Sequence, residues 1–521
     1  MPNMSRAVPR PAVSLCCRLW LLAALLLAGC ATNPVTKKSE LSFVSEQQEI
    51  SIGKQQYLQS QQSAGGRFLL DPALAAYVND VGQKLAKVSD RPQLPFEFVI
   101  INDSVPNAWA LPGGKLAINR GLLTELKSEA ELAAVLAHEI VHAAARHGAR
   151  AVEQGTLLAA GAAIIGVLGA DQRHADIIDF AAQGGAALLN LRFSREHELE
   201  ADHYGMDYLV RAGYDPQAAV ELQETFVRLA GSKSPGWLAG MFATHPPSQE
   251  RVDANRRKAA TLPAKLFRGE EAYRQKLAFL IRSRPAYVAH DEGRTLLEKQ
   301  PAQALAKADQ ALRLEPREAM FHALRGDALR KLGRTAEAEK EYDEAIKRNG
   351  DYYAFYLNRG LLRQRLGKAA AAQADLERSN TLLPTAAAHF LLGNLAQGAN
   401  REEQAIAHYR QAAASDSDLG KRAGAALVRL DLPRNPGSYV QVEPVADKAG
   451  KLGLRITNRS PAALHRLRVA AVAPGFQREY SSAAVLQPGQ SVVVPMGLNA
   501  TEFGAAAAQL RGRVRSAEVV E

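Results

Sequence analysis

The sequence predicts a multidomain protein with a mostly helical α+β domain that holds a small sheet, then an α-solenoid of helical repeats, then a small β-sandwich. With 521 residues, the chain is too long for one ordinary hydrophobic core. Four glycines beyond position 290 are spaced by 33, 34 and 33 residues. The last ninety residues contain short β-rich runs divided by Pro-Gly and Asn-Arg-Ser turns.

The composition is that of a globular protein, with 47% hydrophobic and 23% charged residues. The formal net charge is +10, and it falls to +7 without the three arginines of the first 29 residues. No basic cluster is interleaved with aromatic residues, so we expect no nucleic-acid partner.

The N-terminus predicts a lipoprotein signal peptide over residues 1–29. The apolar run LWLLAALLLAG has 11 residues, which is too short to span a bilayer. It ends in LAGC, which resembles the lipobox of bacterial lipoproteins and implies cleavage before Cys30 and lipidation of its thiol. Ala31 in place of Asp favours the outer membrane, and an uncleaved anchor is the alternative. The mature chain would then hold no free thiol, so a cysteine zinc site is excluded.

The first domain is expected to begin with helices between about Leu41 and Val88. The run FEFVII is aromatic and β-branched, which predicts a strand, and AWALP and KLAIN around Gly113-Gly114 predict a hairpin. Ser128 and Glu131 form a capping-box pattern, which predicts a helix from about Glu129 to a C-cap at Gly148.

The stretch LAHEIVHAAARHG lies inside this predicted helix. Residues four apart share a helix face, so His138 and His142 can direct their rings at one point, as a zinc ion requires. Glu139 is rotated by about 100° around the axis and can face a water as general base without binding the metal. A helix with two satisfied imidazoles is the alternative, and a third ligand decides between them.

A third ligand is expected from the segment SREHELEADHYG. Glu198 and Asp202 are four apart on one face, so we predict Glu198 as ligand and Asp202 as the partner that orients a ligand histidine, His138. Glu200 points to the opposite side and is the second choice. His147 is expected to be an ordinary helix-end residue. The segment Ala151 to Asn190 predicts a buried helical pair or, alternatively, a lid or membrane-touching flap.

Beyond His290 the period of 34 resembles tetratricopeptide repeats. Gly293, Gly326, Gly360 and Gly393 keep one phase, and Tyr342 matches Leu376 and Tyr409 in the second helix of each repeat. Such helical hairpins bury their apolar faces by stacking into a solenoid. The expected domains are a signal peptide (1–29), a polar tether (30–40), the α+β domain (41–265), a linker helix (266–290), the repeats (291–431) and the β-sandwich-like domain (432–521).

Four motifs in order carry a family resemblance: NAWALPGGKLAINRGLL, HEIVH, ELEAD and HPPSQER. Together they resemble the gluzincin family of CAAX prenyl protease, Oma-type and HtpX-type metallopeptidases, which implies a zincin-type peptidase domain over roughly Leu41 to Ala260. The chain is most similar to the periplasmic BepA-like (beta-barrel assembly-enhancing) proteases with C-terminal tetratricopeptide repeats. The terminal β-rich domain departs from that pattern.

The resemblance implies one zinc ion per chain on His138, His142 and Glu198, with Glu139 as general base. His245 matches the histidine of the family's HP loop, which implies a place near the metal. It could stabilise the oxyanion of the tetrahedral intermediate or ligate zinc and hold the enzyme latent, and the sequence leaves both open. The resemblance also implies a substrate-binding edge strand, made of Asn107, Ala108, Trp109, Ala110 and Leu111.

The sequence therefore predicts a lipid-anchored zinc metalloendopeptidase of the bacterial periplasm, held at the outer membrane, that hydrolyses misfolded or stalled envelope proteins in protein quality control. The repeats are expected to recruit substrate or the outer-membrane assembly machinery. The alternative is a repeat-based chaperone or assembly adaptor with latent or minor protease activity. A purely structural zinc site commonly uses thiolates, which the mature chain lacks.

Overall fold

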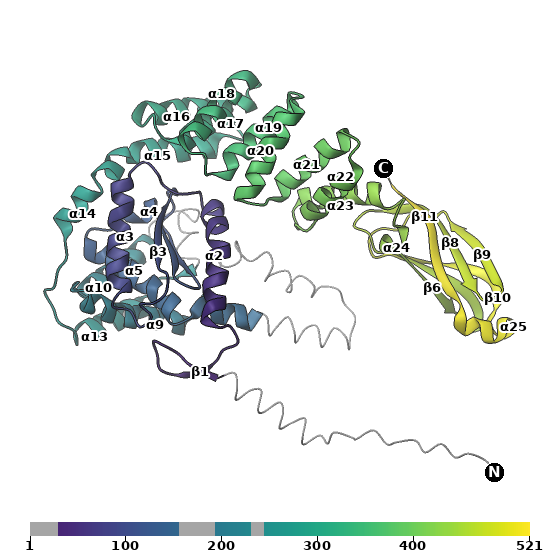
Figure 1. The fold of residues 1–521 in the computed structure, drawn as a ribbon, viewed down its shortest axis with the longest axis horizontal. Coiled ribbons are helices and arrows are strands. Elements are labelled where there is room, and N and C mark those ends of the chain that lie inside the picture. The colour runs from purple at the N-terminus through teal and green to yellow at the C-terminus, as the bar shows by residue number, and fades with distance from the viewer. Residues whose placement is uncertain (1–29, 156–192, 231–243, 521) are drawn as a thin grey trace, which may run out of the picture. The chain divides into compact units, whose positions relative to one another are not determined.

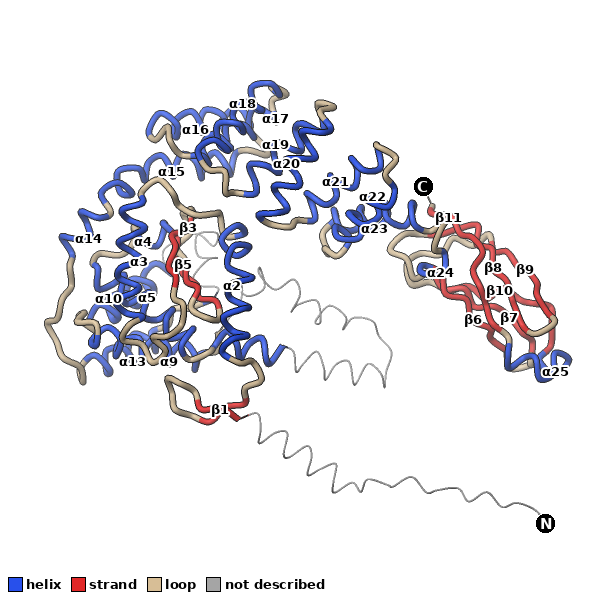
Figure 2. Tube along the Cα trace, in the orientation of Figure 1, coloured by secondary structure: helices blue, strands red, loops and turns tan. Residues whose placement is uncertain are grey.

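The computed structural model describes residues 30–155, 193–230 and 244–520 (Figures 1 and 2). Two compact units divide the chain: the first runs to Ala328 and includes Arg348–Tyr352, and the second holds Leu329–Lys347 and Tyr353 onward. The predicted signal peptide lies outside the described residues. So does most of the segment Ala151 to Asn190, for which a helical pair or a lid was expected.

A small three-stranded sheet lies at the centre of the first unit, in the order β3-β5-β4. The predicted hairpin is confirmed, because β4 pairs antiparallel with β5 while β3 runs parallel to β5. Gly113 and Gly114 turn the chain with φ of 76° and 85°, which favours glycine. The strands are β3 (Glu97–Ile101), β4 (Ala108–Leu111) and β5 (Lys115–Asn119).

Helices cover this sheet and form most of the first unit, as Figure 1 shows. They enclose one apolar core, to which the sheet contributes Leu116 and Ile118 and the helices contribute Leu132, Ile140 and Met206. The helices are α2 (Glu46–Ser63), α3 (Pro72–Ala86), α4 (Arg120–Leu123), α5 (Glu129–Ala144), α9 (Arg195–Arg211), α10 (Gln217–Ala230), α13 (Gln249–Ala259), α14 (Glu270–Lys276) and α15 (Ala278–Leu296).

Helix α5 begins as predicted but ends earlier. The Ser128 hydroxyl caps its first turn by accepting a hydrogen bond from the Glu131 backbone N–H, and the Glu131 carboxylate accepts one from the N–H of Lys127. The prediction of Gly148 as C-cap is wrong: α5 stops at Ala144, and Arg146 has a left-handed φ of 64°. The chain turns there and starts a new helix at residue 147.

The segment expected to be a polar tether is folded onto the domain. Strands β1 (Cys30–Thr32) and β2 (Ser39–Leu41) pair antiparallel, with Cys30 opposite Leu41. The side-chain amide of Asn33 between them donates to the carbonyl of Ala145, 3.0 Å away, just beyond the end of α5. Helix ends leave carbonyls without partners, and this contact explains why the segment is ordered.

The tetratricopeptide-like pattern is confirmed as successive helical hairpins. A Cβ on Gly360 would lie 2.9 Å from the Leu376 side chain, and one on Gly393 would lie 2.5 Å from the Tyr409 ring. These are the positions that the repeat phase matched. The helices are α16 (Pro301–Leu314), α17 (Ala319–Lys331), α18 (Thr335–Arg348), α19 (Tyr353–Arg365), α20 (Ala369–Leu382), α21 (Ala386–Gly398), α22 (Glu402–Ala413) and α23 (Asp418–Asp431).

The C-terminal β-rich region forms two antiparallel three-stranded sheets that share one core, as predicted. Their orders are β10-β7-β6 and β11-β8-β9. Leu454 and Ile456 of one sheet meet Leu467 and Val469 of the other, and Val428 of α23 joins the same core. The elements are α24 (Pro436–Tyr439), β6 (Val440–Ala446), β7 (Lys451–Asn458), β8 (Leu464–Ala473), β9 (Phe476–Ser482), β10 (Ser491–Asn499), α25 (Ala500–Phe503), the 3₁₀ helix η2 (Gly504–Gln509) and β11 (Arg511–Val519).

Candidate active site

Helix α5 holds the two histidines and the glutamate of the HExxH motif, and all three side chains are buried. Because His138 and His142 are one turn apart, their rings lie on the same face. Their Nε2 atoms are 3.1 Å from one another, so both face one point. Burial lowers the pKa of His142 well below its usual value, which keeps its ring neutral, the form that binds metals.

Helix α9 brings the predicted third ligand to the same point. Ser194 caps its first turn by accepting from the N–H of His197. The Glu198 carboxylate then lies with Oε2 3.5 Å from Nε2 of His138 and Oε1 3.5 Å from Nε2 of His142. The structure thus brings the three predicted ligands together from two helices that are more than fifty residues apart in the chain.

Asp202 lies where the face argument placed it, one turn after Glu198. Its Oδ1 is 2.9 Å from Nδ1 of His138, so this ring can donate to the carboxylate and leave Nε2 free. Burial opposes ionisation of Asp202, but the guanidinium of Arg251 and the contact with His138 outweigh it and lower the pKa of the carboxyl.

Arg251 is a site residue that sequence reasoning did not assign. It lies in the first turn of α13, which Ser248 caps, and only 4% of its surface is exposed. Its Nε donates to Oδ2 of Asp202 at 2.7 Å and its Nη2 to Oδ1 at 2.8 Å. Its Nη1 is 2.8 Å from Oε2 of Glu198. The two prolines and the arginine of HPPSQER were the available signal, since a buried carboxylate pair needs a cation.

His245 enters the same cluster from the loop before α13. Its Nδ1 is 2.8 Å from Oε1 of Glu198 and 3.4 Å from Nε2 of His138. Its Nε2 is 3.6 Å from Oε1 of Glu139. The ring is 2% exposed and contributes a fourth donor atom beside the three predicted ligands.

This donor set fits a zinc ion. Four donor atoms, from His138, His142, Glu198 and His245, lie within 4.8 Å of one another. Tetrahedral zinc with bonds of about 2.0–2.1 Å sets its ligand atoms about 3.3 Å apart, close to the distances of 3.1 to 3.5 Å seen between several of these donors.

Glu139 stands beside the donors with both carboxylate oxygens buried and without a hydrogen-bond partner. Such groups are rare in proteins, and a water or ion is the usual explanation. Burial raises the pKa of Glu139, while His245 and His138 oppose the shift. The carboxylate can therefore accept a proton from a water held among the donors.

Two outcomes correct the sequence reasoning about the remaining polar residues. Glu200, the second choice as ligand, faces away from the donor cluster toward His147 and Lys38. His147 is not an ordinary helix-end residue: it is fully buried, and its Nδ1 lies 2.8 Å from Nδ1 of His142. Burial lowers the pKa of His147 to about 4, so its ring is neutral.

The expected substrate strand is present as β4, the outer strand of its sheet. Ala108, Trp109 and Leu111 are buried beneath it, and Trp109 meets the Tyr57 ring edge-on at 6.3 Å. Asn107 precedes the strand, and its carbonyl accepts from the N–H of Asn119. The strand also packs against α5, which bears the HExxH residues.

In the parts of the chain that the structure describes, each helix is too short or too polar to cross a membrane.

The fold and site define a metallopeptidase of the HExxH type, in which one helix supplies two histidines and a glutamate and a second helix supplies the third ligand. Comparison with known proteins agrees. Residues 72–259 match the model of peptidase family M48, and residues 292–354 match a tetratricopeptide repeat model. The chain is 31% identical over 245 residues to the mitochondrial metalloendopeptidase OMA1 of Schizosaccharomyces pombe, covering 45% of this chain and 69% of that relative. The chain belongs to peptidase family M48.

Bacterial relatives are similar over the same region. The putative beta-barrel assembly-enhancing protease of Vibrio cholerae is 33% identical over 204 residues, which cover 37% of this chain and 40% of that relative. The beta-barrel assembly-enhancing protease of Escherichia coli K12 is 31% identical, over 47% of this chain and 51% of that relative. The chain thus spans about half or less of the length of these two. Among solved structures, the Arabidopsis OM64 TPR domain matches with a TM-score of 0.22 at 23% identity, over 22% of this chain and 98% of that chain.

Proposed function

We propose that this protein is a zinc metalloendopeptidase of the bacterial periplasm that cleaves misfolded or stalled envelope and outer-membrane proteins. One observation carries the proposal: the donors of His138, His142 and Glu198 converge beside the unpartnered carboxylate of Glu139. The envelope substrates are supported by the bacterial relatives, which are named beta-barrel assembly-enhancing proteases.

In the proposed reaction, His138, His142 and Glu198 hold one zinc ion per chain. Zinc, when bound, supplies Lewis acidity, which acidifies water and polarises a carbonyl. Glu139 accepts a proton from the attacking water and donates it to the leaving amine, as a general base and then a general acid. Asp202 holds the His138 ring so that Nε2 faces the metal position.

The edge of β4 is the proposed place for substrate. An extended peptide can add to the outer strand of a sheet through main-chain hydrogen bonds. We assign this contact to the five residues from Asn107 to Leu111, which lie against α5. This mode reads the backbone before side chains, so unfolded segments of varied sequence are the expected substrates.

The experiment that tests the proposal is cleavage of unfolded casein by the purified protein and by its Glu139→Gln variant. Only the wild-type protein is expected to cleave, and cleavage should stop when a chelator removes the metal. Equal cleavage by both proteins would contradict the proposal.

A second candidate, a repeat-based chaperone or assembly adaptor with latent or minor proteolysis, is favoured by the position of His245. Its Nδ1 lies among the ligand atoms, where a fourth ligand would exclude the reacting water. This geometry supports the blocking role over the oxyanion role. A protein that spends most of its time in this form would act mainly through its repeats.

Replacing His245 with Ala is therefore expected to raise the rate of casein cleavage several-fold while zinc stays bound to the three remaining ligands. The measurement is kcat together with zinc content, with the exposed His203→Ala as control. A fall in kcat at unchanged zinc content would show that His245 stabilises the transition state instead.

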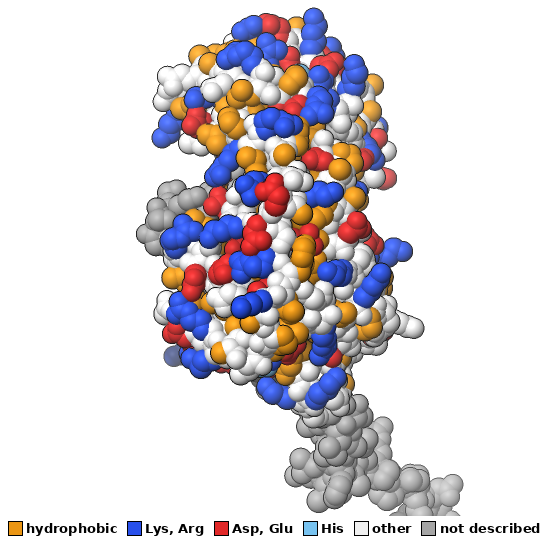
Figure 3. Space-filling view, turned by 90° about the vertical axis from the view of Figure 1, so that its left-hand side faces the viewer, with side chains coloured by type: hydrophobic (Ala, Val, Ile, Leu, Met, Phe, Trp, Pro, Cys, Tyr) orange, Lys and Arg blue, Asp and Glu red, His pale blue; other side chains and the backbone are white. Residues whose placement is uncertain are grey.

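Membrane attachment is proposed through lipid on Cys30, with the outer membrane as destination. On the face shown in Figure 3, acidic and basic side chains are interspersed, so the anchor is the proposed link to lipid. The repeats are proposed to recruit substrate or assembly machinery. A Cys30→Ala variant is expected to leave the membrane fraction of fractionated cells, and its retention there would contradict the anchor.

A further inference from the structure

Each histidine on α5 has a second ring nitrogen, and the two rings are held in different ways. Nδ1 of His138 meets the Asp202 carboxylate directly at 2.9 Å. Nδ1 of His142 meets another imidazole, Nδ1 of His147, at 2.8 Å. On its far side, Nε2 of His147 faces Oε2 of Glu200 at 3.5 Å, and neither of these two buried atoms has a closer hydrogen-bond partner.

Proton positions along this chain of contacts are fixed by one another. If Nε2 of His142 binds a metal, its Nδ1 carries the proton and donates to Nδ1 of His147. The proton of the neutral His147 ring must then lie on Nε2, where it points at the Glu200 carboxylate. The opposite tautomer of His147 would place two N–H groups face to face at 2.8 Å. Glu200 therefore selects the tautomer of His147, and His147 selects the tautomer of His142.

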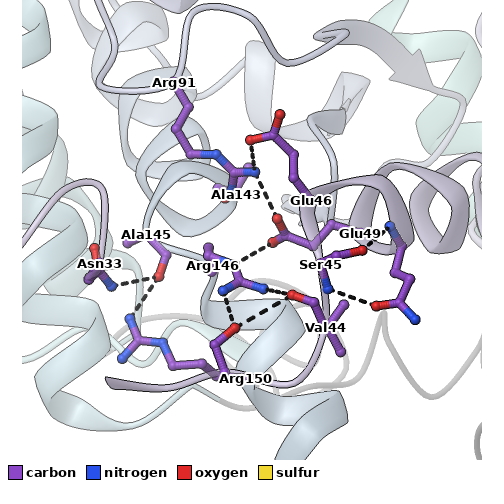
Figure 4. Close-up of polar contacts among 12 residues, drawn as sticks. Asn33, Val44, Ser45, Glu46, Glu49, Arg91, Ala143, Ala145, Arg146 and Arg150 are labelled. Carbon is purple, nitrogen blue, oxygen red and sulfur yellow. Dashed lines mark hydrogen bonds and ion pairs between the residues drawn. The ribbon is translucent and has the colours of Figure 1, made fainter. Parts of the chain in front are cut away.

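The backbone beyond α5 is built to hold His147 in this place. The chain reverses at Arg146, whose φ of 64° is strained for a residue other than glycine. Arg146 is fixed by the hydroxyl of Ser42, the carbonyl of Val44 and the carboxylate of Glu49, the last at 3.2 Å. Figure 4 shows these contacts converging from the segment that follows β2.

The last carbonyls of this region also have partners. Ala145 accepts from Nη2 of Arg150 at 2.7 Å as well as from Asn33, and Ala143 accepts from Nη1 of Arg91 at 3.4 Å (Figure 4). Cations at a helix C-terminus are favourable. Lys38, between β1 and β2, pairs with Oε1 of Glu200 at 3.1 Å. The turn and the carboxylate are thus both held from the N-terminal segment.

We propose that His147 and Glu200 form a second orienting relay of the active site, which positions His142 as Asp202 positions His138. Both are positioning residues, since neither contacts the donor cluster except through His142. The inference rests on the proposed metal at His138, His142 and Glu198. The relay explains why a histidine and a glutamate outside the ligand set are buried together beside α5.

The test is zinc affinity, measured by competition with a chromogenic chelator, for His147→Ala and Glu200→Gln. Partners of metal-bound histidines are typically worth about 10–100-fold in affinity, so a loss of that size is expected for each variant. His203→Ala and Glu196→Gln are matched controls on the exposed face of α9 and should bind as the wild type does. His147→Gln should recover part of the loss, because its amide can accept from His142 and donate to Glu200.

A second readout reports the ring itself. In side-chain nitrogen NMR spectra of the zinc-bound protein, the wild type should show His142 in the Nδ1–H tautomer, and the variants should show that signal exchange-broadened. If His147→Ala does not fold, the isosteric Glu200→Gln decides the matter. Wild-type affinity and spectra in Glu200→Gln would overturn the relay, whereas a wild-type protein that binds no zinc would overturn the proposed function itself.

Discussion

Replacing Glu139 with Gln is expected to abolish peptide hydrolysis while the protein keeps its fold and its metal. The amide has the shape of the carboxylate but cannot accept a proton from water at neutral pH. A positioned general base contributes about 10²–10⁴-fold to rate, and kcat should fall by at least that factor. Zinc content should not change, because Glu139 is not among the four grouped donors.

Casein cleavage and zinc analysis on the same preparation measure this effect. Glu196→Gln is the matched control, since it removes an exposed carboxylate from the first turn of α9 and leaves the donors intact. Unchanged turnover in Glu139→Gln would rule out the mechanism. Complementation of a deletion strain adds a second result: full rescue by Glu139→Gln would favour the adaptor, and failure to rescue would favour the protease.

Replacing Arg251 with Met is expected to cause the largest loss of stability among single changes at the site. The guanidinium is buried and pairs with both Asp202 and Glu198 at 2.7 to 2.8 Å. Removing one member of a buried ionic network leaves uncompensated charge, which costs about 3–5 kcal/mol. Urea unfolding of the metal-free protein, kept so with a chelator, measures the difference from the wild type.

The loss should depend on pH in a definite direction. In the wild type the pKa of Asp202 is lowered, so its stabilisation is full above the pKa of an unfolded aspartate and is lost as pH falls through the folded value. In Arg251→Met, burial without the cation raises that pKa. The variant should therefore differ most from the wild type near pH 7 and least under acid conditions. Arg256→Met, which breaks exposed pairs with Glu224 and Asp253, should change stability by about 1 kcal/mol or less.

The sequence predicted the parts of the site that depend on local periodicity. A spacing of four residues on a helix fixed the common face of His138 and His142, and the same spacing selected Glu198 and Asp202 over Glu200. The strand, the hairpin and the repeat phase follow equally short-range patterns. Each of these is set by the helix or strand period, which the sequence displays directly.

What the sequence did not reveal depends on contacts between distant segments. Arg251 reaches Asp202 only because α13 packs against α9, 49 residues away in the chain. His147 reaches His142 because the chain reverses at Arg146, and no glycine marks that turn. The segment 30–41 looked like a tether because it is polar. Its polar groups instead bond to the end of α5.

Zinc content, measured by mass spectrometry of the purified protein beside its His142→Ala variant, tests most directly the claim that two helices jointly hold one catalytic metal. We predict one zinc ion per wild-type chain and little or none in the variant. A wild-type protein without bound metal, or a variant with the same zinc content, would contradict this account.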